Sequence, residues 1–178
     1  MTNGTKIRLA PFEERDKTIL FAWANNPELA HYNSPYRPVH WEAHCDWFRS
    51  IASDRTKVVF GLRTIPGDTL VGYVQLKDIH PVHRSAELAI QIGEAADRGR
   101  GYGKAAVSLL LAYAWSDLNL HRVSLRVLAD NAAAINIYEA CGLVIEGRLR
   151  SSAYVEGAWR DELLMAIVNG ERFTAELP

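Results

Sequence analysis

The stretch Arg98–Lys104 reads Arg-Gly-Arg-Gly-Tyr-Gly-Lys and joins an alternating apolar run at residues 85–93 to a long apolar helical pattern at residues 104–115. Its glycines are Gly99, Gly101 and Gly103. Because glycine has no Cβ, three glycines at alternate positions allow a tight turn and a close approach of the backbone to a ligand. The stretch therefore predicts a loop between a strand and a helix.

A strand, a glycine-rich loop and a helix start together form an anion-binding site. Free backbone N–H groups and the positive end of the helix dipole point at one place, and a phosphate or pyrophosphate is the usual ligand. Arg98, Arg100 and Lys104 add positive charge around this place. We expect a pyrophosphate to bind here.

Two common phosphate motifs do not fit this loop. A Walker loop has glycine five residues before the Gly-Lys pair and a hydroxyl residue after it, but Arg98 and Ala105 stand there. A dinucleotide fingerprint has a third glycine where Lys104 stands. The pattern that remains is Arg-x-x-Gly-x-Gly.

This pattern resembles the pyrophosphate loop of the GCN5-related N-acetyltransferase (GNAT) superfamily. A second stretch, Asn131–Leu143, is similar to the family's helix Asn-x-x-Ala/Ser-x-x-x-Tyr-x-x-x-Gly-Phe, with Leu143 in place of the phenylalanine. The two stretches follow one another in the family's order and separation. Together they cover about residues 85–147, and the order of expected strands extends the resemblance over nearly the whole chain.

Length and composition indicate one compact domain over residues 1–178. Apolar residues make up 48% and charged residues 23%, as in ordinary globular proteins. The net charge of -1 gives no overall attraction to nucleic acid or to an anionic membrane. Cys45 and Cys141 show no metal or redox spacing, and no apolar stretch is long enough to span a bilayer. We expect a cytoplasmic protein.

The pattern of residues predicts an α+β fold, with a mixed, mainly antiparallel, seven-stranded sheet flanked by about four helices. Expected strands cover residues 6–12, 58–63, 70–79, 86–93, 121–128, 143–154 and 160–168. Expected helices cover residues 16–25 and 40–52 and begin near Lys104 and Asn131. Residues 27–40 contain three prolines and several aromatic residues, and we expect them to be irregular and to shape a pocket or cover the core.

The resemblance implies acetyl-CoA as cosubstrate, held at a splay between residues 86–93 and 121–128. It implies that the strand backbone pairs with the pantetheine amides as an added strand would. The implied cofactor-binding residues are Ile90, Gln91, Ile92, Arg98, Gly99, Arg100, Gly101, Tyr102, Gly103, Lys104, Asn131 and Ala134. Asn131 alternatively acts only as a helix cap.

Acetyl transfer needs a neutral amine, an oxyanion donor and a proton for the leaving thiolate. Glu87 is our candidate base, with Glu94 second and a water chain as the alternative. Tyr138 matches the family tyrosine near the cofactor sulfur and is our candidate acid. A backbone N–H near Ile92 would stabilise the oxyanion. The structural alternatives are a solvated strand carboxylate for Glu87 and a packing role for Tyr138.

Other catalytic sites are poorly supported by the sequence. His40 and His44 are one helical turn apart, but they lack the zinc-protease pattern and a third ligand, so we expect no metal. Ser108 lacks the glycine elbow of a hydrolase. Cys141 is expected to be a small packed residue rather than a nucleophile.

The acceptor is the least specified part of the prediction. Within the superfamily the chain resembles the ribosomal-protein N-acetyltransferase branch, and residues 41–48, 72–79 and 86–88 are similar to acetyltransferases of nucleotide-linked amino sugars. An amino-sugar amine is our first expectation, a protein α-amine the second, and a non-catalytic acyl-CoA sensor the alternative of another class. Residues available for the acceptor pocket are His31, Tyr32, Tyr36, Arg37 and Trp41. We expect a small-molecule amine as partner, no nucleic acid or membrane, and a monomer or homodimer.

Overall fold

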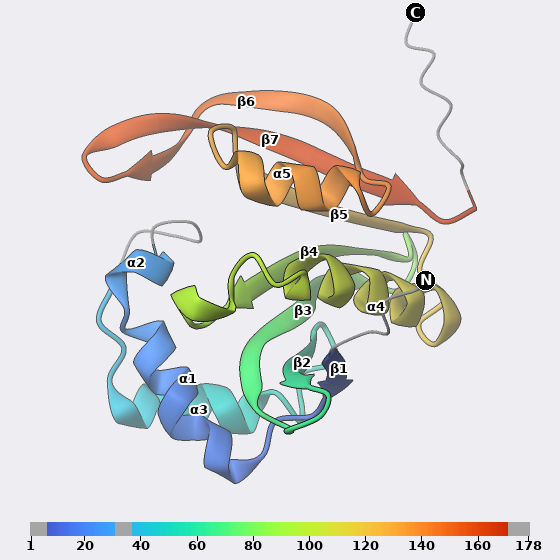
Figure 1. The fold of residues 1–178 in the computed structure, drawn as a ribbon. Helices are drawn as coiled ribbons and strands as arrows, with labels where there is room; N and C mark the ends of the chain where they lie inside the picture. The colour runs from blue at the N-terminus through green and yellow to red at the C-terminus, as the bar shows by residue number, and fades with distance from the viewer. Residues whose placement is uncertain (1–6, 31–36, 171–178) are drawn as a thin grey trace, which may run out of the picture.

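A computed structural model describes residues 7–30 and 37–170, and seven strands in these ranges form one sheet (Figure 1). The strands are β1 (Ile7–Ala10), β2 (Val58–Thr64), β3 (Leu70–His80), β4 (Ser85–Ile92), β5 (Arg122–Leu128), β6 (Val144–Val155) and β7 (Ala158–Val168). Their order across the sheet is β1-β2-β3-β4-β5-β7-β6. All neighbours are antiparallel except β4 and β5, which run parallel.

Five α-helices and two short 3-10 helices accompany the sheet within the described ranges. They are η1 (Glu14–Asp16), α1 (Lys17–Ala24), α2 (Pro27–Ala30), α3 (Trp41–Ser50), η2 (Ala95–Asp97), α4 (Tyr102–Ser116) and α5 (Ala132–Glu139). In Figure 1, α4 and α5 lie beside each other, whereas α1, α2 and α3 form a separate group at the left of the view. No helix in the described part is long and apolar enough to cross a membrane.

The α+β fold and the mixed, mainly antiparallel, seven-stranded sheet expected from the sequence are confirmed. Strands β2, β3 and β4 form the expected meander, and α4 makes the parallel crossover from β4 to β5. Residues 27–40 differ from expectation because a one-turn helix, α2, begins at Pro27. Proline fits the first helical position, and the Asn26 side chain accepts a hydrogen bond from the Glu28 N–H at 3.0 Å.

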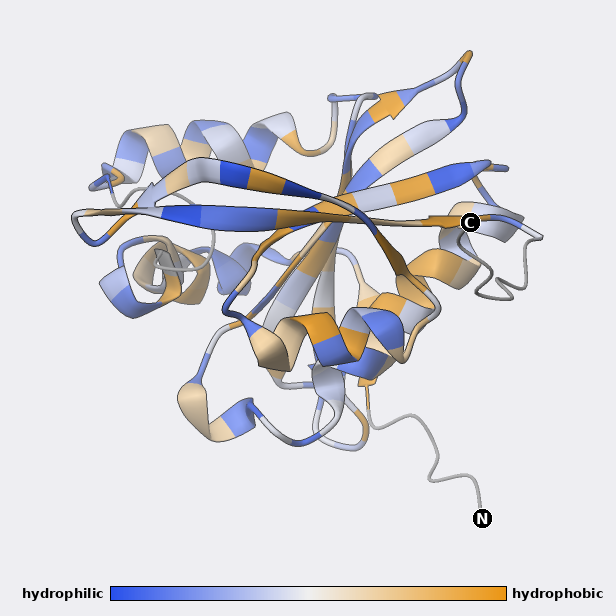
Figure 2. Cartoon of the chain, turned by 90° about the horizontal axis from the view of Figure 1, so that it is seen from above, coloured by the Kyte–Doolittle hydropathy of each residue, from blue (hydrophilic) through white to orange (hydrophobic). Residues whose placement is uncertain are grey.

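Two hydrophobic clusters lie on opposite faces of the sheet. The larger one joins the central strands to α4, whose buried residues Ala106, Leu110 and Ala114 recur at helical spacing. The smaller one is centred on Leu20 and Trp23 of α1 and includes side chains of α3 and β3. Along the helices and strands, hydrophobic residues alternate with hydrophilic ones, as expected of elements with one buried face (Figure 2). The two faces of β3 and β4 therefore belong to different environments.

A buried ion pair fixes the start of α1 to β2. Arg63 and Asp16 are 1% and 3% exposed, and the guanidinium donates a hydrogen bond to the carboxylate at 2.6 Å. The same carboxylate accepts the Glu13 N–H at 2.7 Å, and Arg63 also donates to the Asp68 carbonyl at 3.0 Å. Arg63 Nε has no partner in the part of the chain that is described. Removing Asp16 would leave this buried cation with only the more distant and more exposed carboxylates of Glu13 and Asp68.

We predict that Asp16→Asn lowers the free energy of unfolding by about 3 kcal/mol, because the buried charge of Arg63 loses its nearest carboxylate and keeps only Glu13 at 3.5 Å and Asp68 at 3.9 Å. Urea denaturation measures the change. The matched control is Asp46→Asn, since Asp46 pairs with Arg49 where both side chains are about 70% exposed, and its loss should cost less than about 1 kcal/mol. Equal effects of the two variants would contradict the role of the buried pair.

Candidate active site

Strands β4 and β5 begin side by side and then separate. Their parallel pairing covers only Ser85, Ala86 and Glu87 of β4, opposite residues 122–124 of β5. Beyond this point β4 stays paired with β3, and β5 stays paired with β7 to its end. In Figure 1 the strands β1 to β4 diverge from the group of β5, β6 and β7. The second half of β4 therefore has a free edge toward β5.

Backbone N–H groups alternate in direction along β4, and this alternation determines which of them point to the open edge. The Gly93 N–H donates to the Val71 carbonyl at 3.0 Å, so odd-numbered residues of β4 direct their N–H groups to β3. By the same alternation, the N–H groups of Ile90 and Ile92 face the open edge. The backbone N–H of Gln91 points to β3 and is not available at the open edge. Its side chain lies on the face of the sheet that lines the pocket. An extended ligand with its own amides could pair with Ile90 and Ile92 as an added strand does.

The glycine loop follows β4 and ends in α4. Gly99 and Gly101 have φ values of +72° and +83°, in the left-handed region that favours glycine. An added Cβ at Gly103 would meet Ile137 Cδ1 at 3.1 Å, so this third glycine allows α4 to lie close to α5. The first two glycines thus shape the loop, and the third determines helix packing.

The backbone N–H groups of residues 99–104 donate to no intramolecular acceptor among the described residues. The neighbouring N–H groups are used: Arg98 donates to the Ala95 carbonyl at 3.1 Å, and Ala105 donates to the Gly101 carbonyl at 3.1 Å. The side chain of Tyr102 is buried in the core, so only its N–H is available. The side chains of Arg98, Arg100 and Lys104 are exposed around the loop. This arrangement fits a pyrophosphate.

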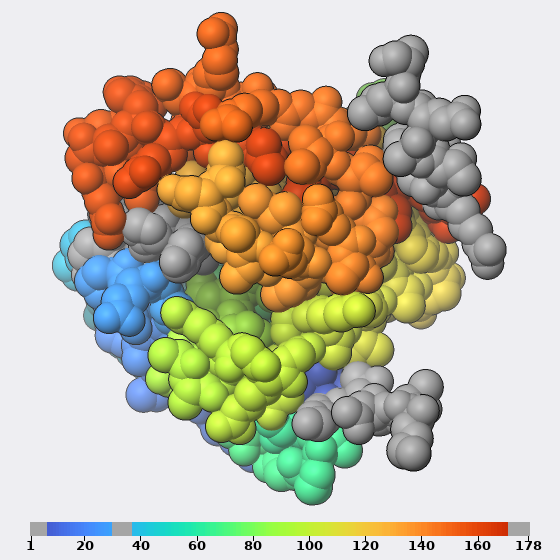
Figure 3. Space-filling view, turned by 45° about the horizontal axis from the view of Figure 1, so that its top comes forward, coloured from blue at the N-terminus to red at the C-terminus, as the bar shows by residue number. Residues whose placement is uncertain are grey.

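The surface is hollowed next to this loop. Figure 3 shows green atoms of the central strands lying deeper than the yellow-green atoms around the glycine loop and the orange atoms of α5. Asn131 lies at the start of α5, where its side chain accepts the Ala134 N–H at 3.2 Å. The expected capping role of Asn131 is therefore confirmed. Ala134 is half-buried against the main core.

Tyr138 lies in the last turn of α5, next to Ile137, which contacts Gly103 of the loop helix. Its side chain is 8% exposed, and its hydroxyl makes no hydrogen bond within the described ranges. Burial, and secondarily the proximity of Cys141, raises the pKa of Tyr138 to about 12. The phenol therefore stays protonated at neutral pH and can donate a proton or a hydrogen bond.

The two candidate carboxylates have different partners. The Glu87 carboxylate forms a salt bridge with the Lys77 ammonium group on β3 at 2.7 Å. Glu87 is the last residue of β4 that pairs with β5. Glu94 follows the end of β4 and accepts a hydrogen bond from the indole N–H of Trp23 at 2.8 Å. Glu87 shares a sheet face with Gln91, about 13 Å away along the strand at roughly 3.3 Å per residue.

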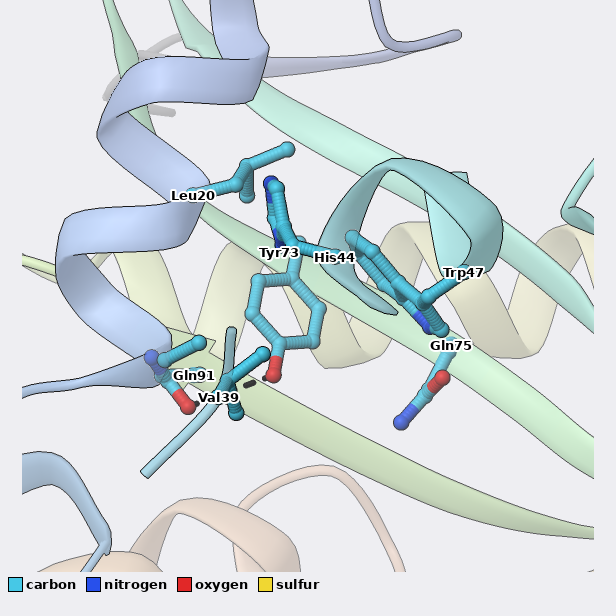
Figure 4. A pocket seen from close by; sticks show the side chains of 8 residues that line it. Leu20, Val39, His44, Trp47, Tyr73, Gln75 and Gln91 are labelled. Atoms are coloured by element: carbon cyan, nitrogen blue, oxygen red, sulfur yellow. Dashed lines mark hydrogen bonds between the residues drawn. The ribbon is translucent and has the colours of Figure 1, made fainter. Parts of the chain in front are cut away.

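A pocket of about 350 Å³ lies on the face of β3 and β4 that α1 and α3 cover. Its described lining residues are Leu20, Ala24, Val39, His44, Trp47, Tyr73, Gln75 and Gln91. The Tyr73 hydroxyl donates to Gln91 Oε1 at 3.2 Å, and burial raises the pKa of Tyr73 (Figure 4). The His44 ring is buried, and its Nε2 bonds to the Lys17 carbonyl at 2.9 Å. The described lining contains no Asp, Glu, Lys or Arg.

Other residues were expected from the sequence to line an acceptor pocket. Arg37 and Trp41 are not among its described lining residues, and His31, Tyr32 and Tyr36 lie outside the described residues. Trp41 is 44% exposed and packs edge-on against Phe21, because α3 is turned so that His44 and Trp47 face the pocket. The sequence signal for this rotation was the spacing of Trp41, His44, Phe48 and Ile51, which places His44 in the centre of the apolar face.

Polar residues of β3 were also missed by the sequence analysis. Tyr73 and Gln75 alternate with the fully buried Val74 and Leu76, which point to the core on the α4 side. Such alternation is usual for a strand with one solvated face, so it gave no indication of a pocket.

Comparison with known proteins agrees with this geometry. The family model for the acetyltransferase (GNAT) domain matches residues 6–144. The chain is 28% identical to the spermidine N(1)-acetyltransferase of Escherichia coli K12 over 94% of this chain and 88% of that protein. It is 35% identical to the Vibrio cholerae spermidine N(1)-acetyltransferase, over 57% of this chain and 58% of that protein.

A solved structure is similar over nearly the whole chain. The Vibrio cholerae spermidine N-acetyltransferase in complex with CoA and spermine has a TM-score of 0.85 and 28% sequence identity, covering 93% of this chain and 96% of that one. The resemblance inferred from the glycine loop and the Asn131 helix is confirmed by these matches. The chain belongs to the GNAT family of acetyltransferases, and its activity is that of an N-acetyltransferase.

Proposed function

We propose that this protein transfers an acetyl group from acetyl-CoA to the primary amine of a neutral or anionic small molecule, with a nucleotide-linked amino sugar as first choice. One observation carries the choice of acceptor. The pocket beside β4 has hydrogen-bonding lining groups, and no Asp or Glu is among its described lining residues. The transfer takes place by direct attack while both substrates are bound.

The donor side rests on backbone groups. The free N–H groups of residues 99–104 bind the pyrophosphate, and the exposed cations Arg98, Arg100 and Lys104 neutralise its charge. The edge amides of Ile90 and Ile92 pair with the pantetheine arm. Acetyl-CoA, when bound, supplies an acetyl group activated as a thioester.

Two side chains transfer protons in the reaction, one as general base and one as general acid. Glu87, directly or through water, accepts a proton from the acceptor ammonium, since an alkylamine with a pKa of about 10 is mostly protonated at neutral pH. Tyr138 holds a proton at Oη for the departing sulfur, and its raised pKa keeps that proton in place until it is needed.

The names of the relatives favour a second candidate acceptor, a polyamine. A polyamine carries several positive charges at neutral pH, and burying such charges without carboxylates is costly. The chain from Pro27 to His40 carries a single acidic residue, Glu28, together with Arg37. This composition favours a neutral or anionic acceptor over a polycation.

The oligomeric state expected from the sequence, a monomer or a homodimer, stays a prediction.

An acceptor panel tests the proposed function. Release of free thiol from acetyl-CoA is measured with a nucleoside-diphosphate amino sugar, spermidine, a peptide with a free α-amine, and no acceptor. We expect the amino sugar to give the highest kcat/KM. Spermidine or the peptide as the best acceptor would replace our first choice. Binding of CoA without release for any amine would indicate a sensor.

We predict that Tyr138→Phe lowers kcat by about 10²- to 10⁴-fold, since it removes the proton donor and keeps the buried ring. Affinity for CoA, measured by calorimetry, should be unchanged. Tyr113→Phe is the matched control, because Tyr113 lies on α4 and packs edge-on against Phe60. Full turnover by the Tyr138 variant would limit this residue to packing.

We predict that Glu87→Gln lowers kcat/KM at neutral pH by about 10²-fold or more, because the acceptor then lacks its base. The deficit should shrink as the assay approaches pH 10, where an alkylamine is increasingly neutral without help. A pH profile of both proteins measures this, with the exposed Glu42→Gln as control. Equal rates at neutral pH would assign proton removal to a water chain that does not involve Glu87.

A further inference from the structure

Gln75 occupies a distinctive position in the acceptor pocket. It lies on β3 opposite Ala89 of β4, on the face turned toward α1 and α3. Because Ala89 has only a methyl group, its side chain is too short to reach over the Gln75 amide. Figure 4 shows the polar ends of Tyr73, Gln75 and Gln91 on the same side of the pocket. Their alternation along two paired strands places them in one polar row.

The amide of Gln75 is uncommitted, whereas its neighbour is engaged. Gln91 accepts the Tyr73 hydroxyl at 3.2 Å, which holds its amide in place. Gln75 is half-buried and has no hydrogen-bond partner in the part of the chain that is described. Water can solvate this half-buried amide in the free protein, so a ligand that displaces the water must offer an equivalent hydrogen bond to avoid a loss of affinity. An amide both donates and accepts, which matches a hydroxyl or a carbonyl.

The charges near Gln75 balance each other. Two residues further along the same face of β3, Lys77 pairs with Glu87 at 2.7 Å. The carboxylate closest along this face, Glu87, therefore already has a cationic partner, and it attracts a second ammonium group less strongly than an unpaired carboxylate would. A second ammonium group of a polyamine would meet the amide of Gln75, which accepts hydrogen bonds but carries no charge. A carboxylate at the same position would supply the missing charge without a change of shape.

We infer that Gln75 is a specificity-determining residue: its neutral amide selects amines that carry a hydroxyl or carbonyl beside the reacting nitrogen and discriminates against polycations. This inference rests on the proposed function and assigns its acceptor preference to one side chain. The isosteric change Gln75→Glu should reverse the preference, because it exchanges a neutral donor and acceptor for an anion.

The test compares wild type, Gln75→Glu and Gln75→Leu with a nucleoside-diphosphate amino sugar and with spermidine. For Gln75→Glu we expect kcat/KM to rise about tenfold or more for spermidine and to fall about tenfold for the amino sugar. The spermidine gain should shrink at high salt, as an electrostatic effect does. Gln75→Leu should lose activity with the amino sugar and gain none with spermidine.

Val82→Glu is the control for added charge, since Val82 is 79% exposed on the turn between β3 and β4. It should leave the acceptor ratio unchanged. All variants should keep the wild-type affinity for CoA, which separates acceptor selection from damage to the donor site. An unchanged acceptor ratio in Gln75→Glu, or an equal gain in Val82→Glu, would overturn the inference.

Affinity for the two amines, measured by calorimetry in the presence of CoA, keeps the two proposals distinguishable. If the wild type releases no thiol with any amine, the proposed function fails, and a shift of amine affinity in Gln75→Glu still supports the role of Gln75. If the wild type acetylates an amine but neither turnover nor affinity shifts in Gln75→Glu, only the inference about Gln75 fails.

Discussion

The active site depends on one constraint, the separation of β4 from β5 after Glu87. Each strand keeps its other neighbour, so the sheet stays intact while one edge of β4 remains unpaired. Unpaired backbone N–H groups are unfavourable away from water and are normally satisfied. In this protein they precede the free N–H groups of the glycine loop along the chain, separated from them by the short helix η2. The fold thus presents two groups of free donors, one on the edge of β4 and one in the glycine loop, which suits an extended ligand that ends in a pyrophosphate.

Side chains and N–H groups alternate in direction along β4, and this alternation separates the proposed acetyl-CoA site from the proposed acceptor pocket. The even-numbered residues Ile90 and Ile92 turn their side chains to the α4 side and their N–H groups to the open edge. The odd-numbered Gln91 turns its side chain to the pocket under α1 and α3. Under the proposed function, a single strand therefore contacts two ligands in two directions. A shift of one residue in register would exchange these roles, so the β3–β4 pairing determines the site as much as the residues do.

The sequence predicted those parts of the fold that depend on local pattern. The glycine loop, the meander and the Asn131 cap each follow from residues close together in the chain. The splay was expected only through the family resemblance, because nothing in the alternation of β4 or β5 indicates where their pairing ends. The pocket was missed for a related reason. Tyr73 and Gln75 resemble any solvated strand face until α1 and α3 cover them, and that packing joins residues far apart in sequence.

The contact of Trp23 with the end of β4 connects the two halves of the site. A Cβ at Gly93 would lie 2.0 Å from the Trp23 ring, so only glycine lets α1 approach this closely. The Trp23 indole N–H then reaches Glu94, the residue that begins the turn into the glycine loop. Leu20 and Ala24, on the neighbouring turns of α1, form one wall of the pocket. One glycine and one hydrogen bond therefore help to fix the distance between this wall of the pocket and the glycine loop. Direct transfer requires such fixed spacing, because reacting groups must be held in contact before the bond can form.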